Sequence, residues 1–201
     1  MKLRKKTLLI IAVTTISMIT IIYAASQIIL LSSFAKLEEQ NIHLNAERAL
    51  SALSDELSGL NSASGDWAEW DDAYAFVLDR NENFIKTNLA DQTFINVRLN
   101  LILFIDTSGQ VVYSKAFDLE NMTEVPVPQS ILDEISISDR IWRHNDTSSR
   151  ITGVILLSED PLLIASRPLL TSQGEGPIHG TLIFARYLNI KEIQYLAEIT
   201  H

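Results

Sequence analysis

Residues 99–117 (LNLILFID-TSG-QVVYSKAF) decide the fold that this sequence predicts. Leu99–Asp106 is a short apolar run, Thr107–Gly109 is a short polar connection, and Gln110–Phe117 is a second run with β-branched and aromatic residues. Two such runs joined by a tight loop that contains glycine are typical of a β-hairpin. The sequence therefore predicts a pair of adjacent antiparallel strands here.

Further strands are predicted downstream of the hairpin, at Ile151–Ser158, Leu162–Leu170 and Gly180–Leu188. Between the hairpin and these strands, Gln129–Ile135 reads as a short helix that follows a proline. A hairpin, a helical crossover and three more strands make an antiparallel α+β domain. This order resembles a PAS/Cache-like domain, with a roughly five-stranded sheet over residues 97–188 and a pocket between the sheet and the crossover.

The N-terminal end carries an apolar segment without charge, Thr7–Ser33. About 24 of these residues, 8–31, would cross a hydrocarbon core of roughly 30 Å as a transmembrane helix in the lipid bilayer. Residues 1–7 form a basic flank. The positive-inside rule therefore predicts a cytoplasmic N-terminus and places the domain that follows, 32–190, on the periplasmic or extracellular side. A cleaved signal peptide is the alternative, but its apolar region usually spans only about 7–15 residues.

The charge distribution excludes several classes of function. All 25 Asp and Glu residues lie after Ser33, together with only 12 of the 16 Lys and Arg residues. Such an acidic domain repels phosphates, so nucleic acid is not an expected partner. The chain has no Cys, and its four His residues show no ligand-like spacing, so no metal site and no cofactor are expected.

The sequence also carries none of the common catalytic motifs: no nucleophile elbow, zinc-protease motif, P-loop or dinucleotide fingerprint. Asp71 and Asp72 are adjacent, and adjacent side chains on a helix point about 100° apart, so they do not converge on a substrate. This region is therefore not expected to be an enzyme. An envelope hydrolase would require a Ser or Asp beside a base in a cleft.

Two helices are predicted before the hairpin, at 34–60 and 66–79, separated by Asn61–Gly65. Asp66 is the expected N-cap of the second helix. In the first helix, leucines 50, 53, 57 and 60 recur at spacings of three and four. This spacing fits either the seam of a coiled coil or a helix that packs on its own domain.

Two other segments outside the sheet complete the prediction. Phe84–Phe94 is expected to be a short bridge that leads into the hairpin. Residues 189–201 are amphipathic and are predicted to form a C-terminal signalling helix that leads to a second membrane span absent from this chain.

An acidic side chain lies among aromatic residues in the second predicted helix. At 100° per residue, Trp67, Trp70, Tyr74 and Leu78 form one stripe, and Asp71 falls inside it. A carboxylate among aromatic rings must find a partner or lose its charge. We therefore expect Trp67, Trp70, Asp71 and Tyr74 to bind a ligand, with the rings facing an amine or another cation. The alternative is a structural ion pair that ties helix to sheet, with Arg98, Arg167 or Arg186 as partner.

Two strand residues complete the candidate ligand site. Arg167 lies in an apolar strand, where a planar guanidinium could clamp a ligand carboxylate. Its alternative role is pairing with Asp71 or Asp66. Tyr113 is expected to line the cavity, although aromatic residues in strands often belong to the core.

A family resemblance follows from these segments together. The motif at Asp66–Phe76 (DWAEWDDAYAF), the strand end and turn at Ile105–Val112, and the segments Ser166–Pro168 and Gly174–Leu182 are similar to the fourth type of CHASE domain. The resemblance covers about residues 34–190.

This family consists of extracellular sensor regions of microbial membrane receptors. The resemblance implies a homodimeric receptor with a second membrane span and a cytoplasmic output module, such as a histidine kinase, diguanylate cyclase or phosphodiesterase. The chain would then be an excised sensor region of such a receptor, which we favour, or a short orphan sensor without an output module.

The expected function is therefore an extracytoplasmic sensor that binds an unidentified small molecule and signals through its terminal helices. The alternative is a ligand-free interaction or mechanical module that recognises a partner protein or the cell envelope. A polar cavity of a few hundred Å³ between sheet and crossover would favour sensing, and a solid core there would favour the interaction module.

Overall fold

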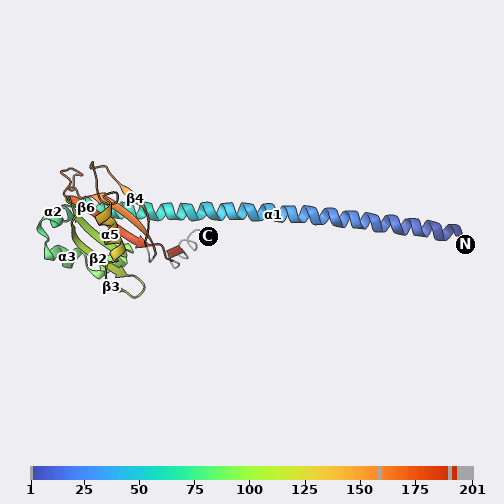
Figure 1. Cartoon of the computed structure of the whole chain (residues 1–201), viewed down its shortest axis with the longest axis horizontal. Helices are drawn as coiled ribbons and strands as arrows, with labels where there is room; N and C mark the ends of the chain where they lie inside the picture. The colour runs from blue at the N-terminus through green and yellow to red at the C-terminus, as the bar shows by residue number, and fades with distance from the viewer. Residues whose placement is uncertain (1, 158–159, 190–191, 194–201) are drawn as a thin grey trace. The chain divides into compact units, whose positions relative to one another are not determined.

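The computed structural model describes residues 2–157, 160–189 and 192–193 (Figure 1). The chain divides into two compact units, Met1–Leu50 and Ser51–His201. The first unit is the N-terminal part of helix α1 (Lys2–Ala68). Its segment Leu3–Leu30 is long and apolar enough to cross a membrane, and none of it is buried within the structure. It includes residues 8–30 of the predicted span, 8–31.

The second unit is built on one six-stranded sheet. Every neighbouring pair of strands is antiparallel, in the order β3-β2-β1-β6-β5-β4. The strands are β1 (Leu101–Asp106), β2 (Val111–Asp118), β3 (Thr123–Val125), β4 (Ile151–Leu156), β5 (Pro161–Pro168) and β6 (Gly180–Tyr187). The predicted α+β, PAS/Cache-like fold is confirmed.

Strand β3 was not predicted. It has only three residues, which is too short for an alternation of apolar and polar side chains to be recognisable. It forms because β2 extends as far as Asp118 and offers a free edge. The Lys115 ammonium also bridges to the Glu124 carboxylate at 3.3 Å.

Within the part of the chain that the structure describes, four helices besides α1 lie around the sheet: α2 (Asp71–Asp79), α3 (Glu82–Asn88), α4 (Asp91–Val97) and α5 (Gln129–Ile137). Helix α5 is the predicted crossover helix. The segment expected to be a bridge, Phe84–Phe94, contains most of α3 and part of α4 instead. The Asn81 side chain caps α3 by accepting a hydrogen bond from the Asn83 backbone N–H at 2.8 Å, a local signal that the sequence analysis missed.

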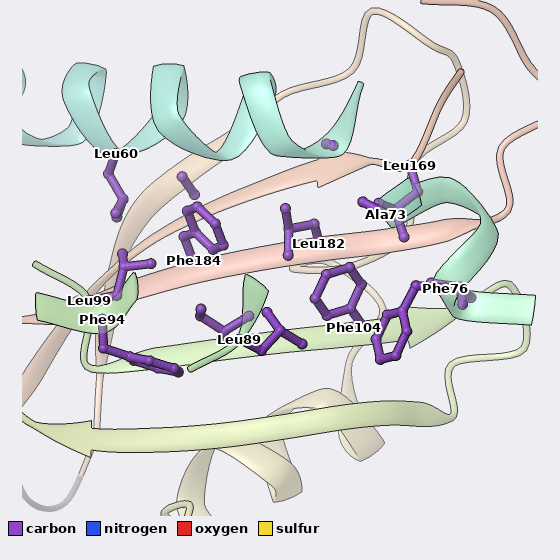
Figure 2. Packing of buried hydrophobic residues seen from close by; sticks show 14 of the residues in the cluster. Leu60, Ala73, Phe76, Leu89, Phe94, Leu99, Phe104, Leu169, Leu182 and Phe184 are labelled. Carbon is purple, nitrogen blue, oxygen red and sulfur yellow. The ribbon is translucent and has the colours of Figure 1, made fainter. Parts of the chain in front are cut away.

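Both faces of the sheet are buried. Along β6, Leu182 and Phe184 contribute to the core under α1 and α2, whereas Ile183 and Ala185 contribute to the core under α5. This is the alternation that a strand imposes on its side chains. Figure 2 shows the first of these cores, in which Leu60 of α1 lies above the strands.

The leucine repeat of α1 belongs mainly to this first core. Leu60 is buried there, and Leu53 and Leu57 pack against it, whereas Leu50 is 67% exposed. The structure therefore favours the second alternative, a helix that packs on its own domain.

The boundary between the first two helices differs from the prediction. Helix α1 continues through Asn61–Gly65 to Ala68, so Asp66 lies inside it and is not an N-cap. Gly65 is buried against the Arg167 side chain, and a Cβ at this position would lie 2.7 Å from Arg167 Nη2. Tertiary contact therefore holds this weakly helical segment in the helix. The break comes at Glu69–Trp70, where Trp70 is extended (φ −114°, ψ 126°) and precedes α2.

The predicted C-terminal helix over 189–201 lies largely outside the described residues. Of this segment, the structure describes 189, 192 and 193.

Candidate functional site

The aromatic motif does not form one helical stripe, because the break at Trp70 separates its members. Trp67 lies in the last turn of α1, Trp70 precedes α2, and Tyr74 lies in α2. Trp67 contacts Trp70 edge-on at 6.0 Å between ring centroids, and it contacts Phe184 of β6 at 5.6 Å. These rings join the core, where aromatic pairs prefer such geometry.

The break also reverses two expectations about α2. Leu78, placed in the predicted stripe, is 65% exposed, whereas Phe76, placed outside it, is buried. Phe76 stacks on Phe84 of α3 and contacts Phe104 of β1 edge-on. A helix that restarts after a turn does not keep the rotational phase of the preceding helix.

Asp71 is exposed, so its predicted burial among the rings is wrong. Its carboxylate accepts hydrogen bonds from the Ser172 backbone N–H at 2.9 Å and from Ser172 Oγ at 2.5 Å. These bonds lower the pKa of Asp71 below its usual value. Asp71 therefore ties the start of α2 to the loop after β5, and none of the three predicted arginines is its partner.

Tyr74 binds the same loop a few residues further on. Its hydroxyl donates to the Pro177 carbonyl at 3.0 Å, and its ring stacks on His179 at 3.9 Å between centroids. The loop also starts beside the end of α1, because the Leu170 N–H donates to the Ala68 carbonyl at 2.8 Å. Asp71 and Tyr74 thus hold the segment between β5 and β6.

Arg167 pairs with Glu69, which the sequence analysis did not consider. Arg167 Nη2 lies 3.6 Å from Glu69 Oε1, and the Arg167 side chain is only 11% exposed. Burial, followed by the neighbouring charge of Arg150, lowers the pKa of the guanidinium. Arg167 therefore faces α1 rather than α5, because odd-numbered residues of β5 point to that side.

Tyr113 lies apart from the other predicted site residues. It packs edge-on against Phe76 and Phe104, and burial, followed by the charges of Glu124 and Asp91, raises its pKa to about 12. It lines a cavity of about 680 Å³ beside Lys115. Of the six predicted site residues, Tyr113 alone lines one of four prominent cavities formed by described residues.

The space between α5 and the sheet is packed with apolar side chains, including Ile131, Ile135 and Trp142. At the edge of this core lies a cavity of about 190 Å³. It is lined by Asp106, Thr107, Trp142, Arg143, His144, Ile178, Gly180 and Thr181. We refer to it as the Trp142 cavity.

Trp142 is held in place from several directions. Its Nε1–H donates to the Ile135 carbonyl at 3.2 Å, and its own carbonyl accepts from Thr181 Oγ1 at 2.5 Å. Its ring covers Gly109, which has φ +89° and whose Cβ, if present, would lie 2.7 Å from the ring. Glycine suits this position on both counts. The wall of the cavity is therefore rigidly positioned.

His144 anchors the same loop to the sheet. Its Nδ1 lies 2.8 Å from Ser149 Oγ, and its Nε2 lies 3.0 Å from Ser166 Oγ. Burial, followed by the charge of Arg167, lowers the pKa of His144 to about 4, so the ring is neutral near pH 7.

This contact places a serine beside a base, the arrangement required of a hydrolase. However, Ser166 is fully buried within β5, and the ring nitrogen opposite it meets a serine rather than a carboxylate. A nucleophile must be exposed to substrate and its base oriented by a third group. The Ser166–His144 contact is therefore a structural anchor.

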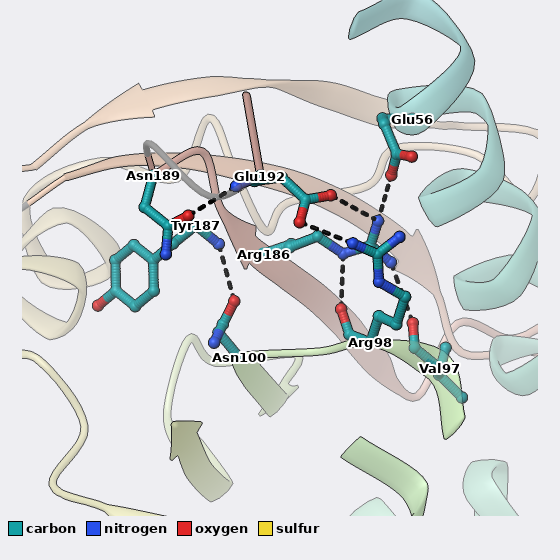
Figure 3. A network of polar contacts seen from close by, with 8 residues as sticks. All are labelled: Glu56, Val97, Arg98, Asn100, Arg186, Tyr187, Asn189 and Glu192. Atoms are coloured by element: carbon teal, nitrogen blue, oxygen red, sulfur yellow. Dashed lines mark hydrogen bonds and ion pairs between the residues drawn. The ribbon is translucent and has the colours of Figure 1, made fainter. Parts of the chain in front are cut away.

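A second polar cluster lies where α1 passes the ends of β1 and β6 (Figure 3). Arg186 is 8% exposed, donates to the carbonyls of Arg98 and Val97 at 2.6 and 3.0 Å, and pairs with Glu56 of α1. Glu192 pairs with Arg98 at 2.8 Å and with Arg186 at 3.6 Å. Arg98 and Arg186, predicted as partners of Asp71, bind these glutamates instead.

The sequence analysis missed Trp142, His144 and Thr181. A weak signal existed, because Trp142 is the third tryptophan and lies two residues before a histidine in a polar loop. Thr181 became recognisable only when β6 was placed beside that loop.

Comparisons with known proteins agree with this architecture. The CHASE4 domain family matches residues 52–201. The methanogenesis regulatory histidine kinase FilI of Methanothrix harundinacea is 31% identical over 171 residues, which cover 85% of this chain and 19% of that protein. The chain thus spans about a fifth of the length of this relative.

A solved structure with a TM-score of 0.50 shares the fold. A domain of a sensory box/GGDEF family protein from Vibrio parahaemolyticus superposes with a TM-score of 0.50 at 13% identity, covering 81% of this chain and 62% of that one. The ligand-binding domain of the Campylobacter jejuni chemoreceptor Tlp3, solved in complex with L-valine, has a TM-score of 0.44 at 13% identity, with coverage of 77% and 64%. On the family match and the FilI sequence, this chain belongs to the CHASE4 domain family.

Proposed function

We propose that this chain is the extracytoplasmic sensor region of a membrane-bound signal-transduction receptor that binds a small molecule in the Trp142 cavity. CHASE4 domains are sensor domains of receptors, and the relative FilI is a histidine kinase, so a histidine kinase is the favoured output. Residues 8–31, nearly all of which belong to the apolar segment Leu3–Leu30, would cross the membrane, with residues 1–7 in the cytoplasm and 32–190 outside.

The Trp142 cavity is the observation that supports the proposed ligand site. It combines an aromatic wall, a neutral imidazole, a hydroxyl and side chains of opposite charge at Arg143 and Asp106. Ligand sites typically pair such a wall with a few polar groups, but usually occupy roughly 300–1,000 Å³. A volume of about 190 Å³ fits a small metabolite. The opposite charges favour a zwitterion or carboxylate of amino-acid size.

The predicted site residues then do not contact the ligand themselves but hold the segments that form or support the cavity. Asp71 and Tyr74 hold the loop between β5 and β6, and this loop contributes Ile178 to the cavity beside Gly180, the first residue of β6. Trp67, Trp70 and Tyr113 support the core below, and Arg167 holds β5 against α1. The Trp/Asp motif thus positions a wall of the site.

Arg186 on β6 links the segment that enters the domain to the segment that leaves it, and this link could transmit a signal. Glu56 lies on α1, and Glu192 follows the last strand, and both bind Arg186. A ligand-dependent shift of β6 would therefore move both terminal segments in a homodimeric receptor.

A second candidate function is a ligand-free interaction module. The observation that favours it is the solid apolar packing directly beneath α5, where the larger cavity was expected.

A thermal-shift screen of the full chain in lipid nanodiscs, with amino acids, amines and organic acids, tests the ligand proposal. A ligand that raises the melting temperature should lose its effect in Arg143→Ala. Arg143 is about half exposed, so this change should barely alter basal stability. The matched control is Arg140→Ala, an exposed arginine of the same loop outside the cavity, which should retain the shift. No ligand response would favour the interaction module, and an equal response in both variants would place the ligand outside the Trp142 cavity.

A further inference from the structure

Two asparagines of the domain stand in the sequence Asn-X-Thr, the acceptor motif of N-linked glycosylation in proteins outside the cytoplasm. They are Asn121, followed by Thr123, and Asn145, followed by Thr147. A motif of three residues also arises by chance, so the folded structure must decide which asparagine can accept a sugar. The acceptor must lie in a surface loop, and its side-chain amide must be free to react.

Asn145 meets both requirements. It is exposed in the irregular segment between α5 and β4. In the part of the chain that the structure describes, neither its side-chain amide nor the Thr147 hydroxyl has a hydrogen-bond partner. The carboxylate of Asp146, between them, accepts hydrogen bonds from the Ser148 backbone N–H at 2.9 Å and from Ser148 Oγ at 2.7 Å. This Asx turn holds the backbone and leaves the Asn145 amide in solvent.

Asn121 is exposed as well, but its amide is already bonded. Its Nδ2 donates to Asp118 Oδ2 at 2.7 Å, and its backbone N–H donates to Asp118 Oδ1 at 3.2 Å. Hydrogen bonds to a carboxylate are among the stronger ones in proteins. The next residue, Met122, has φ +51°, which is uncommon for a residue with a side chain. A sugar on Asn121 would disrupt this turn, whereas a sugar on Asn145 disrupts no contact.

We propose that Asn145 carries an N-linked glycan and that Asn121 does not. The donor is a lipid-linked oligosaccharide phosphate on the outer side of the membrane. The Asn145 side-chain nitrogen forms a bond to the anomeric carbon of the first sugar, while the bond from that carbon to the donor phosphate oxygen breaks. The amide loses one proton, and the lipid phosphate leaves with the electron pair, so nothing is oxidised or reduced. This inference rests on the proposed function, which places 32–190 outside.

The glycan lies beside the Trp142 cavity. Arg143 and His144, the two residues before the acceptor, line that cavity. On the other side of the acceptor, Thr147 Cγ2 lies 3.6 Å from the position that a Cβ on Gly176, in the loop between β5 and β6, would take. A glycan is bulky and hydrated. Here it blocks contact with a flat protein surface but not the entry of a small molecule, which favours sensing over the interaction module.

Mass spectrometry of the full chain, purified from the membranes of its own cells, tests the assignment. Trypsin releases His144–Arg150, in which Asn145 is the one asparagine, and Ala116–Arg140, in which Asn121 is the one asparagine. The first peptide should carry a glycan, and the second should not. An unmodified Asn145, or a glycan on Asn121 instead, would overturn the proposal.

Two matched variants at Thr147 test the chemistry of the linkage. Thr147→Ala removes the hydroxyl that the acceptor motif requires and should abolish the glycan, although Asn145 is unchanged. Thr147→Ser keeps the hydroxyl and should keep the glycan. A glycan that persists in Thr147→Ala, or that is lost from both variants, would contradict an N-linked acceptor at Asn145.

A labelling experiment separates this proposal from the proposed membrane orientation. The chain has no Cys, so Ser62→Cys places a single thiol at an exposed position of the domain. A membrane-impermeant maleimide should label it on intact cells. Labelling together with an unmodified Asn145 would overturn the glycan and leave the outside position intact. A thiol that reacts only after the cells are broken would overturn both.

Discussion

Replacing Arg186 by Met should destabilise the domain by about 3–5 kcal/mol, the cost typical of removing one partner from a buried ion pair. The Arg186 side chain is 10% exposed, and its partners Glu56 and Glu192 are 15% and 10% exposed. Glu192 keeps Arg98 at 2.8 Å, which favours the lower end of this range. The carbonyls of Val97 and Arg98 also lose a donor each.

The measurement is a urea titration of the full chain in detergent, followed by tryptophan fluorescence. Trp67, Trp70 and Trp142 all lie in the same compact unit, so they report its unfolding. A loss of about 3 kcal/mol corresponds to a melting temperature lower by about 6–12 °C for a domain of this size. The matched control is Lys86→Met, which breaks an exposed pair with Glu82 (75% and 85% exposed) and should cost under about 0.5 kcal/mol.

A double variant tests whether this stability cost comes from the broken ion pair. If the cost comes from a stranded Glu56 carboxylate, then Arg186→Met combined with Glu56→Met should regain more than about 1 kcal/mol over the single change. A loss below about 1 kcal/mol in Arg186→Met, or no recovery in the double variant, would show that the network is weakly coupled to folding.

Two pH-dependent effects follow from other contacts. His144 has a pKa lowered to about 4 from 6.5, so the unfolded chain binds more protons and stability should fall as the pH drops from about 6.5 towards 4. His144→Gln should flatten this part of the stability curve in urea titrations, and an unchanged slope would contradict the neutral anchor. Asp71 has a lowered pKa, so its contribution should be present above 3.8 and vanish as the pH falls through the folded pKa. The free energy of unfolding of Asp71→Asn should therefore equal that of the wild type at acid pH and be lower than that of the wild type at pH 7. The variant should keep the ligand-induced rise in melting temperature. Loss of this ligand response without a loss of stability would instead show that Asp71 contacts the ligand.

The strands were predictable because their signals are local. Strands β1 and β6 are buried on both faces, so each appears in the sequence as an uninterrupted apolar run bounded by turn residues. The Thr107–Gly109 turn between β1 and β2 supplied the direction of pairing. Strand β3 gave no such signal, because its three residues depend on the neighbouring β2 edge.

The ends of the helices were less predictable, since helix-breaking residues act only where tertiary contacts allow. Gly65 indicates a break when the sequence is considered alone, yet its missing side chain lets Arg167 pack against α1 and so favours a continuous helix. Shifting the break by a few residues then changed the face on which Phe76 and Leu78 lie.

The amino-acid sequence by itself determined the antiparallel sheet, the apolar span, the acidic domain after it and the family. These features depend on residue type and spacing within about ten neighbours. The tertiary structure alone decided which charges meet and where a cavity opens. Asp71 binds Ser172 across 101 residues, and Arg186 binds Glu56 across 130. Such pairings depend on how the elements pack. From the sequence alone, Arg98, Arg167 and Arg186 were equally plausible partners of Asp71, and only their positions in the folded domain showed which acidic groups they bind.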